Sequence, residues 1–499
     1  MTLSHTAYPD RIARSRIEFE MGVWQRFAHY YLEFIQAHAA DRLRIERELE
    51  QIRRAWAWVK DNGNANLMLS YIWAMHPFFE QRALWAEAIE WYECGLVVAQ
   101  SINHLHDVGS LWNNLGAAWY ALNNWNRSWE CYQQAQSTFQ QLDDRVCQAK
   151  SLNGLGLVCQ AKGEMIEALQ YYEQASTLFR AENDFAGEAT VLHNIGQLYA
   201  SLEQWDDALS FYERALELRC AQGNSVAIAL TLNNLATACR SKAETVPGPE
   251  REPWLTKALN YGSQARELFA ETGHRFYEAV ALGNLGELAQ HLERFDDALA
   301  YGEQALQMFR EFGSPLQEAI SLANLGNLYS ITGDVERAIV YSEQALASFE
   351  ALERRAEQVT LLNNIADMYH TAGDLDVALT YLTRAVNLCR DLGDKNTEAE
   401  TLMAIGEVYL RKHEFDLARQ NLEQARDLFR SIGDHRGEVI ALNNLALALQ
   451  FQGQDEPCRL LYEEALQLAH FIGDQELTDL ISHNMSRLSK ANRSTDGRS

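Results

Sequence analysis

The chain has 499 residues, of which 47% are hydrophobic and 10% aromatic, so it has enough apolar surface to fold and is not disordered throughout. Its 69 acidic and 43 basic residues give a formal net charge of −26, which excludes the concentrated basic surface needed to bind nucleic acid or an anionic membrane. A basic protein partner fits this charge, and so does a surface that is only solvated. Prolines are few, seven in all, which favours a largely helical chain.

The first hundred residues are irregular and aromatic, and ten of the twelve tryptophans lie before residue 130. We interpret them as the bulky core of an N-terminal helical capping segment over residues 1–64; a second binding surface is the alternative. The N-terminus has no apolar stretch of the signal-peptide type, and no run of 18 apolar residues occurs. The eight cysteines include no CxxC pair. We therefore expect a soluble protein of the reducing cytoplasm.

Beyond this segment the sequence repeats itself. A small residue recurs after Leu or Ile every 40 residues, with one interval of 50, and serves as the anchor of each repeat: Gly116, Gly156, Gly196, Ala236, Gly286, Gly326, Ala366, Gly406 and Ala446. An alanine lies 19 residues after each anchor, or 29 after Ala236: Ala135, Ala175, Ala215, Ala265, Ala305, Ala345, Ala385, Ala425 and Ala465. Small residues at fixed places allow two helices to approach closely. The longer interval holds three prolines around residue 249, where we expect a lengthened surface turn.

Each repeat predicts two helices. In one of them the first helix is indicated by apolar and small residues spaced i, i+3, i+4 and i+7: Leu192, Ile195, Gly196 and Tyr199. The second helix carries a similar stripe: Ala208, Phe211, Tyr212, Ala215 and Leu218. Gly223 lies where that helix should end, and five other repeats have a glycine at the equivalent place, as is typical of helix C-termini.

This pattern resembles the tetratricopeptide repeat (TPR), in which Leu-Gly, an aromatic residue and two alanines occupy these offsets. The 40-residue period is similar to the longer-helix arrays of LGN/Pins-type polarity adaptors and kinesin light chains. The resemblance implies an all-α fold, a right-handed superhelical solenoid of antiparallel helix pairs. We expect a solenoid of about ten pairs over residues 65–474, a capping helix over 475–490 and a disordered tail over 491–499.

Residues 42–75 also resemble the start of the TPR sensor half of STAND-type signalling ATPases. In that family a similar acidic helix and a tryptophan-bearing helix lead from a winged-helix domain into TPR units. The sequence contains no GxxxxGK[ST] phosphate-binding loop. The resemblance therefore implies at most a sensor half without its ATPase.

The candidate binding residues come from the first helix of each repeat. Positions −2 and +1 relative to the anchor lie opposite the packed side, on the face that in TPR proteins lines the concave groove. Position −2 is asparagine in seven of nine repeats: Asn114, Asn194, Asn234, Asn284, Asn324, Asn364 and Asn444. Asparagine is a mediocre helix former, so helix propensity does not explain its recurrence. Its amide can bind the backbone of an extended peptide. Hydrogen bonds between neighbouring repeats are the alternative, and both can hold.

Further polar residues widen this face. Asn233, Asn363 and Asn443 occupy position −3, and Glu287, Asp367 and Glu407 occupy position +1. The carboxylates favour a partner that bears Lys or Arg, with an ordinary solvated face as the alternative. Carboxylate-clamp adaptors instead place Lys and Arg beside their asparagines. Those bases are mostly absent here, so we do not expect an acidic C-terminal tail as ligand.

The sequence has no HExxH, EF-hand or GxSxG motif, and its histidines show no metal-ligand spacing. We therefore expect no catalytic residue, no metal site, no cofactor and no enzymatic activity. The pattern predicts a scaffold or adaptor that holds a partner peptide or helix in its concave groove. The alternative is a stand-alone sensor or regulatory subunit of a STAND-like or TPR-protease signalling system, which acts with a separately encoded effector.

Overall fold

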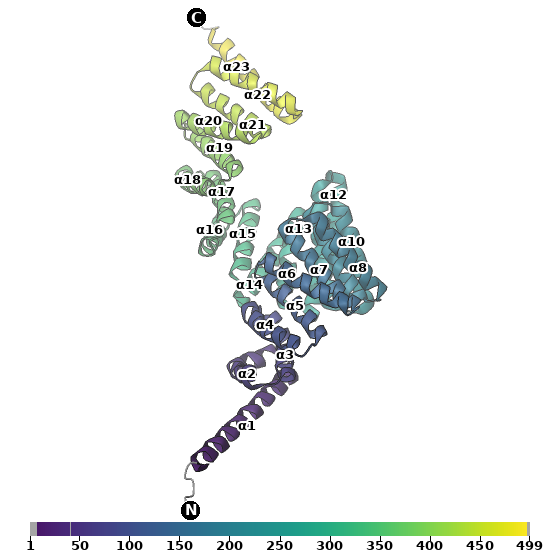
Figure 1. Cartoon of the computed structure of the whole chain (residues 1–499). Helices are drawn as coiled ribbons and strands as arrows, with labels where there is room; N and C mark the ends of the chain where they lie inside the picture. The colour runs from purple at the N-terminus through teal and green to yellow at the C-terminus, as the bar shows by residue number, and fades with distance from the viewer. Residues whose placement is uncertain (1–6, 40, 497–499) are drawn as a thin grey trace, which may run out of the picture. The chain divides into compact units, whose positions relative to one another are not determined.

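The computed structural model describes residues 7–39 and 41–496, which form 23 helices and contain no strand. The chain divides into two compact units, Met1–Pro247 and Gly248–Ser499. In each unit, successive helices pack side by side and run antiparallel (Figure 1). The prediction of an all-α fold built from helix pairs is confirmed.

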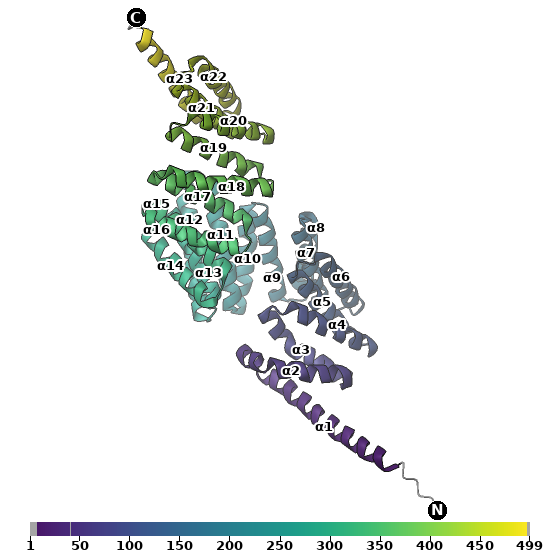
Figure 2. The same ribbon diagram turned by 90° about the vertical axis from the view of Figure 1, so that its left-hand side faces the viewer.

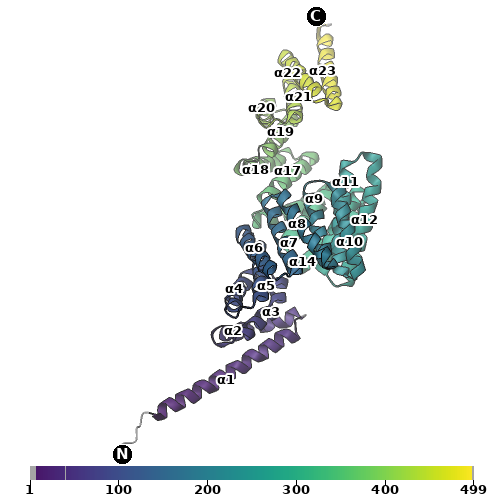
Figure 3. The same cartoon turned by 45° about the vertical axis from the view of Figure 1, so that its right-hand side comes forward.

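The first unit begins with two helices that precede the regular pairs, as the two further views show (Figures 2 and 3). Its helices are α1 (Ala7–Ala37), α2 (Arg42–Asn62), α3 (Ala65–Arg82), α4 (Trp85–Ser101), α5 (Leu105–Ala121), α6 (Trp125–Gln141), α7 (Arg145–Lys162), α8 (Met165–Ala181), α9 (Phe185–Ser201), α10 (Trp205–Gln222) and α11 (Ser225–Thr245). From α3 to α10 the helices alternate between the first and second helix of a repeat.

The second unit begins with a second helix and ends with a single one. Its helices are α12 (Gly248–Glu271), α13 (Arg275–His291), α14 (Phe295–Phe312), α15 (Pro315–Ile331), α16 (Val335–Ala351), α17 (Arg355–Ala372), α18 (Leu375–Leu392), α19 (Lys395–Arg411), α20 (Phe415–Ile432), α21 (His435–Phe451), α22 (Asp455–Ile472) and α23 (Gln475–Asp496). From α13 to α22 they form five pairs.

The predicted small residues are packing contacts. All nine alanines that follow the anchors are completely buried. A Cβ atom added to Gly156 would lie 2.5 Å from a ring carbon of Tyr172, and one added to Gly196 would lie 2.7 Å from Tyr212. The absence of a side chain at these anchors therefore lets the tyrosine of the second helix lie against the backbone of the first.

The turns between helices are short because their central residue adopts a left-handed conformation. Gly223 closes α10 with φ of 70°, as the sequence predicts, and Asn183 takes the equivalent place after α8 with φ of 55°. Left-handed backbone is accessible to glycine without steric cost and is tolerated by asparagine. The chain then enters the next helix, often through an aspartate cap: the Asp184 side chain accepts a hydrogen bond from the backbone N–H of Gly187.

The ten extra residues between Ala236 and Gly286 do not form the lengthened turn that the prolines suggest. They extend α11 to Thr245 and allow α12 to begin at Gly248, so only two residues separate the helices. Pro249 and Pro253 lie in the first two turns of α12. A proline in the first turn removes no intrahelical hydrogen bond, and the second one removes a single bond, so the helix tolerates both.

The tryptophan-rich segment contributes to a continuous apolar core that runs from α1 to α6. Within it, Trp56 of α2 stacks on Trp91 of α4 with ring centroids 4.1 Å apart, and Phe79 of α3 contacts Trp91 edge-on. Trp24 and Trp125 instead keep about two-fifths of their surface exposed. Most of the large rings in this segment thus fill the interior beside the first regular pairs.

The last helix is longer than the sequence analysis expects. Helix α23 runs from Gln475 to Asp496, and therefore extends into the segment 491–499 that was expected to be a disordered tail. No glycine or proline occurs between Gly473 and Gly497, so nothing in the sequence interrupts the helix before that point. Residues 497–499 lie outside the described part of the chain.

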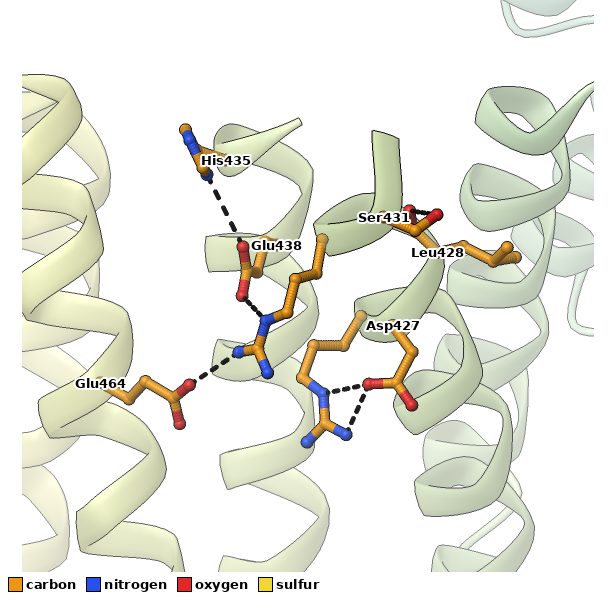
Figure 4. A network of polar contacts seen from close by, with 8 residues as sticks. Asp427, Leu428, Ser431, His435, Glu438 and Glu464 are labelled. Carbon is orange, nitrogen blue, oxygen red and sulfur yellow. Dashed lines mark hydrogen bonds and ion pairs between the residues drawn. The ribbon is translucent and has the colours of Figure 1, made fainter. Parts of the chain in front are cut away.

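An ion pair recurs where one repeat meets the next. An arginine near the end of the second helix binds a glutamate eight residues later, in the following first helix; the pairs are Arg180–Glu188, Arg310–Glu318, Arg390–Glu398 and Arg430–Glu438. Figure 4 shows the labelled carboxylates Glu438 and Glu464, which Arg430 bridges with hydrogen bonds of 2.6 and 2.8 Å. The pairs are partly exposed, so each adds roughly 0–1 kcal/mol and serves mainly to set the register of neighbouring repeats.

Candidate partner-binding face

The asparagines at position −2 and the acids at position +1 lie on the first helices, and we call them together the amide face of their unit. In the first unit it comprises Asn114, Asn194 and Asn234. In the second unit it comprises Asn284, Asn324, Asn364, Asn444, Glu287, Asp367 and Glu407. Each of these residues falls in mid-helix, where the local fold fixes the direction of its side chain.

In the first unit each asparagine of the amide face contacts the preceding repeat. Asn194 donates a hydrogen bond of 2.8 Å from Nδ2 to Oδ1 of Asn153. The amide of Asn234 lies 3.1 Å from Nε2 of His193, and the amide of Asn114 lies 3.4 Å from Nδ1 of His76. Asn194 and Asn234 therefore contact the residue before the equivalent position in the preceding repeat, whereas Asn114 contacts His76, two residues after that position.

In the second unit the asparagines reach a different partner. Asn324 donates to the Glu287 carboxylate over 3.2 Å, and Asn444 donates to the Glu407 carboxylate over 2.8 Å. The acceptor in both cases is position +1 of the preceding repeat. The amide and acid positions that the sequence analysis treats separately are thus joined by hydrogen bonds.

The remaining predicted residues have varied surroundings. Asn364 is exposed and makes no hydrogen bond with any described residue. Asn363 donates a hydrogen bond of 3.1 Å to the hydroxyl of Thr401, and Asn443 accepts one of 2.9 Å from Asn484. The residues Asn233 and Asn284 are half-buried and also have interaction partners. Most of the amides therefore connect repeats, and Asn364 keeps its donors and acceptor available.

The structure brings Asp367 and Glu407 together, while Glu287 lies in another hollow beside Asn324. Asp367 and Glu407 line a cleft of about 210 Å³ between α17 and α19, with Asn363, His370 and Glu400 also on its walls. Both acids are exposed. Desolvation by the surrounding wall raises the pKa of Glu407, the Asp367 carboxylate raises it further, and the hydrogen bond from Asn444 opposes the shift. The cleft is therefore a site where an added cation would be stabilised.

His370, which the sequence analysis did not single out, completes the wall of this cleft. Its Nε2 is buried and has no hydrogen-bond partner among the described residues. Burial lowers its pKa, and the nearby guanidinium of Arg411 lowers it further. A neutral imidazole leaves the negative charge of the cleft uncompensated. Position +4 is polar in most repeats, among them Gln160, Arg240, Gln290, Ser330 and Gln450, but only the stacking of the repeats shows that His370 lines the cleft.

One group of potential metal ligands exists among the described residues. The side-chain donor atoms of His106, Asp144 and Cys147 lie within 4.8 Å of one another. Asp144 already uses Oδ1 to cap the N–H of Cys147, and its Oδ2 lies 3.5 Å from Nε2 of His106. Burial raises the pKa of the Cys147 thiol to about 11, so it is protonated at neutral pH. The helix cap and this contact account for the position of the aspartate.

The stacked antiparallel pairs, closed by buried alanines and left-handed turns, define an α-helical repeat protein of the solenoid class. The sequence model of the tetratricopeptide repeat matches residues 107–181, 187–245, 255–311, 316–396 and 397–470, which together exceed half of the chain. The chain therefore belongs to the tetratricopeptide repeat family, as its spacing predicts. Among curated proteins, none matches it in sequence.

The chain is similar to several solved structures. One is a STAND (Signal Transduction ATPase with Numerous Domains) protein with a tetratricopeptide repeat sensor from Pyrococcus horikoshii, with a TM-score of 0.54 and 14% identity over 75% of this chain. The chain spans 55% of that protein's length. Aspartyl phosphate phosphatase F from Bacillus subtilis has a TM-score of 0.45 and 15% identity, over 78% of this chain and 96% of that one. A kinesin light chain from Podospora anserina, with nearly identical TPR-like repeats, has a TM-score of 0.37 and 17% identity. The similarity covers 40% of this chain and 98% of that one.

Within the described residues, no helix combines the length and the apolar character that crossing a membrane requires.

Proposed function

We propose that this chain is a non-catalytic scaffold or adaptor of the cytoplasm, which binds an extended or helical segment of a partner protein along its amide face. The observation that carries the proposal is the cleft of the second unit, in which the exposed carboxylates of Asp367 and Glu407 face shared space. The unbonded amide of Asn364 lies on the same helix as Asp367. A peptide backbone can pair with the amide while a Lys or Arg side chain enters the cleft.

The inter-repeat hydrogen bonds are compatible with this role. A side-chain amide has two N–H donors and an oxygen with two lone pairs, so a single donated bond leaves most of its capacity. Asn324 is exposed even though it donates to Glu287. The same contacts that fix the stacking therefore hold each amide in a defined orientation, which lowers the entropy lost when a peptide binds.

The formal charge of −26 supports a basic partner segment. Desolvation is the main cause of the raised pKa of Glu407, and repulsion by the Asp367 carboxylate adds a smaller contribution. A cation placed between them relieves that repulsion and gains two charge-assisted hydrogen bonds. Long-range attraction to the acidic chain also increases the association rate at low ionic strength.

The test is affinity capture from a native lysate, read by mass spectrometry, with the wild type and an Asp367→Asn/Glu407→Gln variant. We expect the variant to lose a specific set of basic partners while its circular dichroism stays unchanged. The matched control is Glu271→Gln/Asp391→Asn, which removes two exposed carboxylates of the same unit outside the cleft. If both variants lose the same partners, net charge alone explains the effect. If the Asp367→Asn/Glu407→Gln variant retains all partners, the proposed site is refuted.

A second candidate function is that of a sensor subunit which regulates a separately encoded effector. It is favoured by the shared fold of the Pyrococcus horikoshii STAND protein, whose tetratricopeptide repeats are described as a sensor. The genes beside the coding sequence distinguish the two functions, because a neighbouring NTPase or protease gene is expected only for the sensor. Co-purification of that neighbouring gene product with this chain then provides the biochemical test.

A further inference from the structure

Arg219 occupies a position that the repeat otherwise reserves for an apolar side chain. Allowing for the ten-residue insertion, the position 23 residues after the anchor is a buried phenylalanine in six repeats: Phe139, Phe179, Phe269, Phe309, Phe349 and Phe429. Cys389 and Ala469 fill it in two others. In α10 the position holds Arg219, whose side chain reaches into the same interior and leaves the residue only 9% exposed. It is the one charged residue at this place in the nine repeats.

The buried guanidinium has no carboxylate to balance it. In four other repeats an arginine lies one residue later and binds a glutamate of the next helix, as Arg180 binds Glu188. In α11 the equivalent of that glutamate is Ile228. No ion pair joins Arg219 to any described residue, and desolvation lowers its pKa with no nearby acid to oppose the shift. A buried charge without a partner destabilises a fold, so its presence calls for a compensating ligand.

One nitrogen of Arg219 makes all of its contacts with the protein. Nη1 donates its two hydrogens to the backbone oxygen of Ala227 over 3.1 Å and to the hydroxyl of Thr231, and it lies 3.3 Å from Nδ1 of His193. Nε and Nη2 form no hydrogen bond with the described residues, and neither is enclosed by them. The parallel donors of the Nε–Nη2 edge therefore have no acceptor among the described residues and keep a small contact with solvent, and this edge is the one that pairs side-on with a carboxylate or phosphate.

His193 adds no negative charge and no competing proton. Its Nδ1 lies 3.3 Å from Nη1 of Arg219 and its Nε2 lies 3.1 Å from Nδ2 of Asn234, and a neutral ring accepts a hydrogen bond at only one of these two nitrogens. Burial lowers the pKa of His193 to about 4, and Arg219 contributes in the same direction. At neutral pH the imidazole of His193 is therefore uncharged and lies against the Nη1 side of the guanidinium. The positive charge of Arg219 is not balanced by this neighbour.

We propose that Arg219 forms an oxyanion-binding site, in which its Nε–Nη2 edge binds a carboxylate or phosphate group of a ligand in a bidentate manner. The site lies in the first unit and stands independently of the acidic cleft. It also differs from the carboxylate clamp, whose Lys and Arg lie beside the asparagines of the first helix. Arg219 lies in the second helix of its repeat, at a position that holds a core residue in the other repeats. The positions next to the asparagines, where Lys and Arg are mostly absent, predict no acidic C-terminal tail as ligand, and Arg219 lies outside them.

The test measures the melting temperature in phosphate, acetate or chloride at equal ionic strength and pH 7. For the wild type we expect phosphate or acetate to raise it by about 2–4 °C over chloride when the anion is well above its Kd. The Arg219→Phe variant restores the residue typical of the repeat and should melt higher than the wild type in chloride, with no anion response. Arg219→Met is the second variant in case the phenylalanine disturbs folding. Arg214→Gln, on the exposed side of α10, is the matched control and should respond like the wild type.

The two Arg219 variants also control for general effects of the anions on stability, because such effects act equally on a chain that lacks the site. A direct readout is the line width of the phosphate ³¹P resonance, which the wild type should broaden and Arg219→Met should not. A response to phosphate alone assigns a phosphorylated ligand, and a response to acetate assigns a carboxylate; both support the site. The proposal is overturned if the wild type responds to neither anion, or if Arg219→Met keeps the response.

Discussion

The side-chain amide of Asn444 donates a 2.8 Å hydrogen bond to the carboxylate of Glu407, which lies 37 residues earlier in the chain. Asn324 and Glu287 repeat the same relationship at the same separation. An amide at position −2 thus stabilises the carboxylate at position +1 of the preceding repeat by a hydrogen bond. These two sets of residues act as one polar network on the face where we propose that a partner binds.

Asn444 and Asn364 provide a matched pair for separating stacking from ligand binding. Asn444→Ala removes a hydrogen bond to a charged acceptor at a residue that is 8% exposed, and should lower the free energy of unfolding by about 1–3 kcal/mol. Asn364→Ala removes an exposed amide without a hydrogen bond, and should change stability by less than ~0.5 kcal/mol. Urea unfolding followed by circular dichroism measures both. Equal destabilisation would show that the two amides have the same structural role.

Glu407→Gln should make the protein more stable at pH 7. A carboxylate whose pKa is raised in the folded state favours folding most when protonated, so its contribution is complete below the unfolded-state pKa and is lost as the pH rises through the folded-state value. Glutamine keeps the acceptor for Asn444 and removes the charge. The difference in melting temperature between variant and wild type should therefore shrink as the pH falls from 7 towards 4. A difference that is independent of pH would contradict the raised pKa.

Gly156→Ala and Gly286→Ala should have opposite effects, although both lie in the middle of a first helix. The new Cβ at position 156 would lie 2.5 Å from the Tyr172 ring, and the overlap should cost about 1–3 kcal/mol. At position 286 the nearest atom is the Ala298 oxygen at 3.4 Å, an ordinary contact. Alanine there should stabilise the helix by up to ~1 kcal/mol. Thermal melts of the two variants measure the contrast, and destabilisation by Gly286→Ala would contradict the predicted space.

The cysteines should react with a thiol reagent in two classes. Cys220 is exposed, whereas Cys131, Cys159, Cys239, Cys389 and Cys458 are buried. Burial raises the pKa of Cys159 to about 12 and that of Cys389 to about 11, so almost no thiolate forms at neutral pH. We expect Cys220 to be labelled first in the native protein, and the five buried thiols only after unfolding. Mass spectrometry identifies the labelled residues, with Cys220→Ser as the control; rapid labelling of Cys159 would refute the prediction.

The repeat pattern predicts most of the fold because the contacts within a helix pair depend on short separations. Gly196 and Tyr212 are 16 residues apart and pack directly, and Gly223 ends its helix through its own backbone conformation. The prolines near residue 249 show the limit of such reasoning. They were expected to lengthen a turn, but two of them fall in the opening turns of α12, where helix geometry tolerates a missing donor.

The sequence alone determined the period, the helix pairs and the face on which the asparagines lie, since each follows from side-chain spacing along one helix. The tertiary structure decided what those side chains bind. It joined Asn194 to Asn153 and Asn444 to Glu407, and it left Asn364 unbonded. The same is true of Arg219, whose departure from the phenylalanine pattern is visible in the sequence but whose open edge is not. The physical reason is that these contacts depend on how one repeat rotates against the next, which packing between helices sets and the spacing within one helix does not encode.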